Sequence, residues 1–192
     1  MPISLQKGGN VSLSKEAPGL TQAIIGLGWD VNSSDGAAFD LDASCFLLGD
    51  NGKVIKDIDF IFYNNPKSED GSVIYSGDNR TGTGEGDDEQ ITVDFTKVSP
   101  AIKKIAVVVT IHEAQERGQN FGQVNNAYVR LVNKSNNTEI VRYDLTENYS
   151  LFTAITVCEV YRRDNEWKFR ALGNGFQGGL KPLAESYGVA IG

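Results

Sequence analysis

Ten short apolar segments, separated by turn-forming residues, constrain the fold of this chain more than any other feature. They are rich in β-branched and aromatic residues and too short for core helices, as expected of strands. The segments lie at 23–28, 43–48, 60–63, 73–76, 91–95, 105–111, 127–133, 139–144, 154–161 and 166–172. Many short strands at this spacing predict an all-β fold, a sandwich of two β-sheets.

Turn and helix signals complete this prediction. The turns are expected at Asp50-Asn51-Gly52 and Asp70-Gly71, with hairpins at Asn136-Asn137 and Asp164-Asn165. Only a few short helices are expected, after Ser99-Pro100, at 113–117 and at 180–187, where Gly188 ends the last one.

Size and composition limit the classes of protein that fit. The 192 residues contain no linker-like change of composition, which predicts one domain over 1–192. The net charge of −7 argues against a nucleic-acid partner. No apolar run approaches the ~18 residues of a membrane span, and no secretory signal is present, so we expect a cytoplasmic protein that does not cross the membrane. Cys45 and Cys158 lie in apolar segments and are expected to be buried free thiols rather than zinc ligands.

The residues 77–90 form a glycine-rich acidic segment, Gly-Asp-Asn-Arg-Thr-Gly-Thr-Gly-Glu-Gly-Asp-Asp-Glu-Gln. Crowded carboxylates repel one another unless a cation lies among them, and Ca²⁺ prefers many oxygen ligands. A second acidic cluster holds Asp40 and Asp42, which project from one face if the chain is extended. Together the two clusters predict a calcium site, and the alternative is a solvated acidic turn.

The calcium site cannot be a standard loop. An EF-hand that started at Asp78 would need oxygen ligands at its third and fifth positions, which hold Arg80 and Gly82. The site must therefore be discontinuous and built from loops that the fold brings together.

Two other functions stay open as alternatives. A glycine-rich loop can hold phosphate, but these carboxylates would repel it unless calcium bridges them, so a calcium-dependent phosphate or cyclic-nucleotide ligand is one alternative. The other is a hydrolase in which His112, the single histidine, acts with Glu113 and a nucleophile such as Ser44. No Gly-x-Ser-x-Gly elbow supports it, and we expect no enzymatic activity.

Residue runs along nearly the whole chain resemble the TerD family. They lie at 5–15, 26–30 (Gly-Leu-Gly-Trp-Asp), 39–44 (Phe-Asp-Leu-Asp-Ala-Ser), 60–65 (Phe-Ile-Phe-Tyr-Asn-Asn), 77–90, 110–114 (Thr-Ile-His-Glu-Ala), 120–124, 142–145, 166–169 and 175–180 (Gly-Phe-Gln-Gly-Gly-Leu).

The resemblance implies a calcium-binding β-sandwich of bacterial tellurium-resistance and stress operons. It implies a binding or scaffold role with other Ter-type proteins, including a membrane component such as TerC. The family's acidic loops map onto eight metal-site residues: Asp40, Asp42, Asp78, Asn79, Glu85, Asp87, Asp88 and Glu89.

Overall fold

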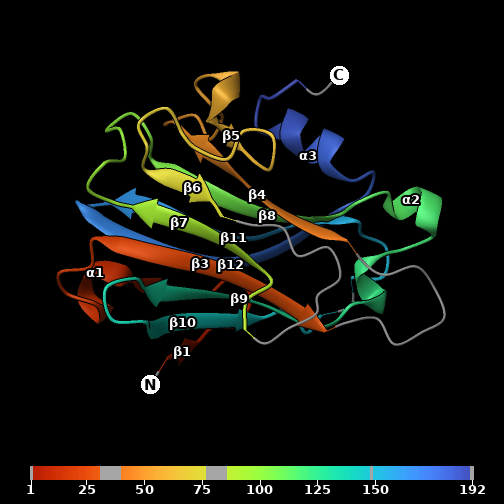
Figure 1. The fold of residues 1–192 in the computed structure, drawn as a ribbon, viewed down its shortest axis with the longest axis horizontal. Coiled ribbons are helices and arrows are strands. Elements are labelled where there is room, and N and C mark those ends of the chain that lie inside the picture. Colours follow the sequence, from red (N-terminus) through yellow and green to blue (C-terminus); the bar gives the residue numbers. More distant parts are fainter. Residues whose placement is uncertain (1, 31–39, 77–85, 148, 191–192) are drawn as a thin grey trace.

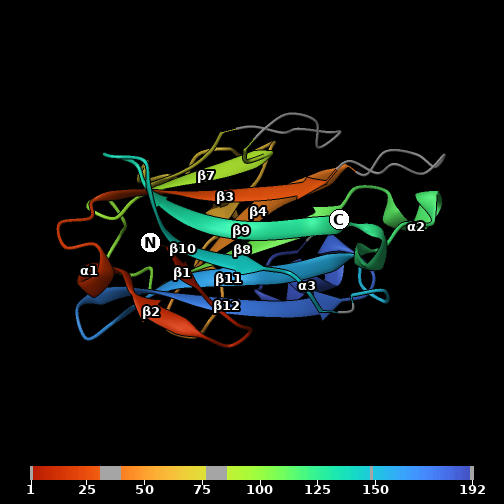
Figure 2. The ribbon, with the colours of Figure 1, turned by 90° about the horizontal axis from the view of Figure 1, so that it is seen from below.

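The protein is a sandwich of two six-stranded sheets, as predicted (Figure 1). This computed structural model describes residues 2–30, 40–76, 86–147 and 149–190. Three of the expected metal-site residues, Asp78, Asn79 and Glu85, lie outside the described residues. Figure 2, turned by 90°, shows that the strands of both sheets run roughly along the long axis of the molecule.

Each sheet combines strands from distant parts of the chain. The first has the order β1 (Ile3–Ser4), β10 (Thr138–Asp144), β9 (Asn125–Asn133), β3 (Gln22–Asp30), β7 (Glu89–Asp94) and β6 (Val73–Tyr75). The second has the order β2 (Asn10–Ser12), β12 (Glu166–Phe176), β11 (Ala154–Arg163), β8 (Lys104–Ile111), β4 (Leu41–Leu48) and β5 (Phe60–Ile61). Neighbouring strands are antiparallel, except that β1 runs parallel to β10.

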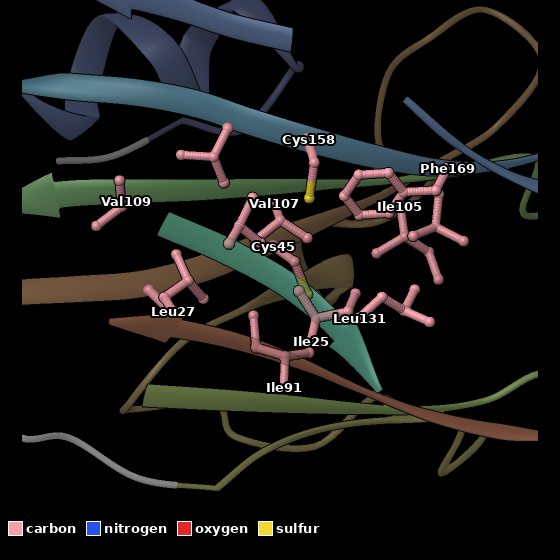
Figure 3. Close-up of a cluster of buried hydrophobic side chains, with 14 of the residues drawn as sticks. Ile25, Leu27, Cys45, Ile91, Ile105, Val107, Val109, Leu131, Cys158 and Phe169 are labelled. Atoms are coloured by element: carbon pink, nitrogen blue, oxygen red, sulfur yellow. The ribbon is translucent and has the colours of Figure 1, made fainter. Parts of the chain in front are cut away.

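The main core fills the space between the sheets (Figure 3). Alternate side chains of one strand point to opposite faces, so Leu41, Ala43, Cys45 and Leu47 of β4 enter this core. Both cysteines are buried and free, and burial raises the pKa of both thiols. Cys45 and Cys158 each lie beside Val107 in register, on opposite sides of β8. Two strand spacings of ~4.8 Å separate them, which is too far for a disulfide.

The outer face of the second sheet carries a smaller core. Phe46 and Phe60 stack there with ring centroids 4.5 Å apart, and the helix α3 (Leu180–Ser186) covers them with Leu183 and Ala184. The backbone after α3 turns at Gly188, where φ is 87°. The remaining helices are α1 (Leu13–Glu16), α2 (Ala114–Arg117), and the 3₁₀ helices η1 (Asp57–Asp59) and η2 (Phe121–Gln123).

Most local predictions are confirmed. All ten predicted segments form strands, and the Asp164-Asn165 turn has φ of 53° and 62°, the two positive values of a type I′ hairpin. The helix predicted after Ser99-Pro100 is wrong, because this segment forms only a turn, with Ile102 N–H bonded to Ser99 O, before β8 begins. The strands β1 and β2 and the helix α1 were not predicted from the sequence. No helix in the described part of the chain is long and apolar enough to cross a membrane.

Candidate functional site

The two acidic segments meet at one end of the sandwich, where β4 and β7 begin. The strand β4 starts directly after Asp40, and β7 starts at Glu89, in the opposite sheet. The backbone N–H of Ala43 donates to Oε2 of Glu89, so one hydrogen bond joins the two strands across the core. Segments more than forty residues apart are thereby brought together.

Glu89 faces the interior between the sheets. It is 1% exposed, and its Oε1 accepts a hydrogen bond of 2.9 Å from the hydroxyl of Tyr75. Its other oxygen accepts from Ala43. A buried carboxylate is expensive unless it is hydrogen-bonded, and these two donors offset that cost. Glu89 is therefore held by donors from both sheets.

Asp87 points to the outer face of the first sheet. Four residues form what we call the Asp87 clamp there, over Gly26: Asp87, Gln90, Tyr128 and Arg130. Arg130 binds the carboxylate with Nε at 2.8 Å and Nη2 at 3.1 Å. The Tyr128 hydroxyl donates at 3.0 Å and the Gln90 amide at 3.1 Å. The Asp87 side chain is only 1% exposed, so its charge is compensated by Arg130 rather than by water.

The clamp depends on the missing side chain of Gly26. A Cβ there would lie 2.1 Å from Oδ2 of Asp87, which is closer than any real contact. The hydrogen bond to Asp87 raises the pKa of Arg130. Burial, followed by the charge of Asp87, raises the pKa of Tyr128 to about 12. The Arg142 guanidinium lies 4.0 Å from the centroid of the Tyr128 ring and closes the clamp on its far side.

Asp88 lies between Asp87 and Glu89 in the sequence, and its side chain accepts a hydrogen bond from the strand β3. Its Oδ2 accepts a hydrogen bond of 2.9 Å from the backbone N–H of Trp29, near the end of β3. The backbone N–H of Asp88 donates to Leu27 O at 2.7 Å. Asp88 therefore fixes the start of β7 to the end of β3.

Asp40 and Asp42 lie at the start of β4. Leu41 points into the core, whereas Asp42 lies in register with Thr110 on the outer face of the second sheet. Asp40 is 5% exposed, and its carbonyl accepts from His112 N–H at 2.7 Å. Asp42 lines a groove of about 500 Å³ that we call the acidic groove, whose further lining includes Tyr63, Thr110, His112, Glu113 and Glu116.

The five described residues of the expected metal site thus lie at one end of the molecule, but their side chains point in different directions. Asp87 faces outward on the first sheet, Glu89 faces inward, and Asp42 faces outward on the second sheet. Among the described residues, no group of three or more His, Cys, Asp or Glu side chains is arranged to hold a metal ion.

The residues of the hydrolase alternative are also placed. His112 Nε2 lies 3.4 Å from Glu113 Oε1, and both side chains are more than 40% exposed. Ser44 is 3% exposed and its hydroxyl is fully enclosed, two residues further into the sheet than Asp42. An enclosed hydroxyl cannot reach a substrate, so Ser44 does not fit the role of nucleophile.

Comparison with known proteins gives a consistent family. The model of the TerD domain matches residues 1–187. The chain is 57% identical over 189 residues to tellurium resistance protein TerD of Serratia marcescens, covering 98% of each. It is 53% identical over 193 residues to general stress protein 16U of Bacillus subtilis, covering all of each.

A solved structure has the same fold. The crystal structure of a homologue of the telluride resistance protein TerD from Streptomyces coelicolor superposes with a TM-score of 0.72 at 26% identity. The match covers 90% of this chain and all of that one.

Proposed function

Because this chain belongs to the TerD family of tellurium-resistance and stress-response proteins, we propose that it is a calcium-binding, non-enzymatic module of a cytoplasmic stress response. The observation that carries the proposal is the hydrogen bond from Ala43 to Glu89, which brings the Asp40–Asp42 segment beside the acidic segment that ends at Glu89. Calcium would resolve the repulsion between these carboxylates.

The contacts divide the expected ligands into two groups. Asp87 and Glu89 support the site, because both carboxylate oxygens of each accept hydrogen bonds from the described part of the protein. Asp40, Asp42 and Asp88 are the described ligand candidates. Asp78, Asn79 and Glu85, outside the described residues, are the candidates that complete the oxygen set.

The chemistry of the segment favours calcium over magnesium. Calcium accepts six to eight oxygens in a flexible arrangement, whereas magnesium requires a near-ideal octahedron. A site assembled from two loops of different sheets suits the more tolerant ion.

Calcium would also change the surface that partners meet. The acidic charge of this end falls when the ion binds, and charge complementarity governs which protein surfaces associate. We propose that the partners are Ter-type proteins, including a membrane component such as TerC. Affinity capture with and without a calcium chelator tests this step. If the same proteins were captured in both conditions, the proposal that calcium controls partner binding would be refuted.

Calorimetric titration with Ca²⁺ and Mg²⁺, combined with thermal melting, tests the metal site. Calcium should bind more tightly than magnesium and raise the melting temperature by mass action. The double variant Asp40→Asn, Asp42→Asn removes two charges with little change of volume and should weaken calcium binding at least ~tenfold, about 1.4 kcal/mol.

The matched control is His112→Gln, which should leave calcium affinity nearly unchanged. Absence of calcium heat with an unchanged melting curve would refute the metal site. If His112→Gln abolished stress protection while the aspartate pair had no effect, a catalytic function would replace this proposal.

A further inference from the structure

Exposed apolar side chains gather on one edge of the sandwich. The strands β5 and β6 are the last strands of their sheets and lie against each other at this edge (Figure 1). Among the described residues, five large apolar side chains are exposed, and four of them belong to these strands or to the segments beside them. We call these four the edge patch: Ile55, Ile58, Tyr63 and Ile74. Single exposed apolar residues are ordinary, whereas grouped ones mark interaction surfaces.

Hydrogen bonds hold the edge patch together. The side-chain amide of Asn65 donates to Ile58 O at 2.9 Å and to Phe60 O at 2.8 Å. Two residues further along, Lys67 pairs with Ile74 in an isolated β-bridge. The chain from Ile58 to Ile74 therefore forms one fixed surface rather than separate loops.

The backbone of this edge is already occupied. Asn65 bonds the carbonyl at the start of β5. In β6, Tyr75 N–H donates to Pro66 O at 2.7 Å, and Val73 O accepts from Ser68 N–H at 2.9 Å. A partner that added a strand would need these groups free. A partner must therefore meet the side chains of the edge patch.

A hollow next to Ile55 suits an apolar side chain. Its volume is about 440 Å³, and Leu47 and Ile102 of the main core line it together with Ile55. The Lys56 ammonium and the Glu69 carboxylate, 2.8 Å apart, lie at its rim. An apolar centre with a polar rim is the usual anatomy of a protein–protein interface.

The charges beside the edge patch fit a second copy of the same chain. Lys56 is paired with Glu69, but Asp57 and Lys67 form no ion pair with any residue that the structure describes. In a two-fold contact, a residue of each copy meets the same counterpart on the other. Asp57 of each copy can then pair with Lys67 of the other. The same patch thus carries both halves of a complementary charge pattern.

We propose that two copies of this chain associate about a two-fold axis through the edge patch. Ile55 and Ile58 of one copy pack against the hollow of the other, and Asp57 and Lys67 form two equivalent ion pairs. This association goes beyond the proposed calcium function and does not depend on it, because no residue of the edge patch belongs to the expected metal site.

Sedimentation equilibrium of the full chain, in the presence of a calcium chelator and over a dilution series, tests the proposal. We expect a monomer–dimer equilibrium and a melting temperature that rises with protein concentration. Ile58→Lys should weaken the association at least ~tenfold, because it places a charge at the apolar centre. Its exposed position should leave the monomer folded, which far-ultraviolet circular dichroism checks.

Leu151→Lys is the matched control. Leu151 is 70% exposed and is the one exposed large apolar side chain of the described residues outside the edge patch. The substitution adds the same charge at an equally exposed apolar position, and the association should stay unchanged.

A charge exchange tests the two-fold arrangement. Asp57→Lys and Lys67→Glu should each weaken the association about threefold, since each places like charges opposite one another. The double variant Asp57→Lys, Lys67→Glu restores opposite charges and should recover the native affinity.

Several results would overturn the proposal. They are a monomer at every concentration, a dimer that Ile58→Lys leaves intact, an equal loss in Leu151→Lys, or a double charge variant as weak as the single ones. Calcium titration of Ile58→Lys separates the two proposals, because its calcium affinity should equal that of the native protein. Absence of calcium binding in a protein that still dimerises would refute the metal site alone.

Discussion

Replacing Gly26 by alanine tests the Asp87 clamp without touching any charged residue. The three atoms nearest to the new Cβ all belong to the Asp87 carboxylate, at 2.1, 2.3 and 2.6 Å. The backbone of β3 is held in register by β7 and β9 on both sides, so it cannot retreat. The carboxylate must therefore move and lose its contacts with Arg130.

The cost follows from the burial of the pair. Removing one partner of a buried ion pair costs about 3–5 kcal/mol. The Asp87 side chain is 1% exposed, but Arg130 is 30% exposed, and solvent screens part of the loss. Alanine also recovers about 0.5 kcal/mol over glycine in a strand. We expect a net loss of about 2 kcal/mol, which lowers the melting temperature of a protein of this size by about 4–8 °C.

A double-mutant cycle in urea isolates the contact. Unfolding of calcium-free protein is followed for Gly26→Ala, Asp87→Ala and the double variant. Once the carboxylate is gone, Gly26→Ala should cost nothing or stabilise slightly, giving a coupling energy of at least ~1 kcal/mol. An equal cost of Gly26→Ala in both backgrounds, or no cost in the native background, would refute the clamp.

Two further predictions concern hydrogen bonds that aspartate side chains accept. Tyr128→Phe removes the hydroxyl that donates to Asp87, and it should lower the free energy of unfolding by about 1 kcal/mol. Urea unfolding of calcium-free protein measures this change, and an unchanged free energy would mean that the Tyr128 hydroxyl does not help to hold the carboxylate. Burial acts to raise the pKa of Asp70, but hydrogen bonds from Ser72, Ser68 and Ser99 outweigh it and lower the pKa. The stability that the ionised Asp70 carboxylate contributes is complete above its unfolded pKa of about 3.9, and it is lost as the pH falls through its lower folded pKa. Asp70→Asn should therefore be less stable than the native protein at pH 6, and it should lose less stability on acidification. Parallel pH curves for the two proteins would contradict this assignment.

The sequence predicts those parts of the fold that depend on local periodicity. Segments such as β8 and β11 contain enough consecutive apolar residues to be recognised as strands without their partners. The residue types Asp164-Asn165 predict a hairpin turn with positive φ, which the structure has. The strands β1 and β2 are only two and three residues long and pair with β10 and β12 far along the chain. Their existence depends on those partners, and no local pattern reveals it.

The candidate site was predictable in composition but not in geometry. The residues at 40–42 and 87–89 could be recognised as acidic clusters, yet nothing local indicates that Ala43 would bond Glu89. Arg130 was missed because it lies forty-three residues after Asp87. One signal was available, since Tyr128 and Arg130 alternate with apolar residues in β9 and so share an outward face.

Three consecutive carboxylates with three different destinations explain why an acidic run is a poor guide to a ligand set. Asp87 binds Arg130 on the outer face, Asp88 binds the Trp29 backbone in β3, and Glu89 reaches Ala43 in the opposite sheet. These three contacts together hold the start of β7 in a fixed position relative to its neighbours. A calcium ion held beside this point would meet ligands that are already positioned, so less of its binding energy would be lost in ordering the chain. In this proposal, the carboxylates that are adjacent in the sequence have two different roles. Some hold the segment in place, and others provide oxygen ligands for a cation.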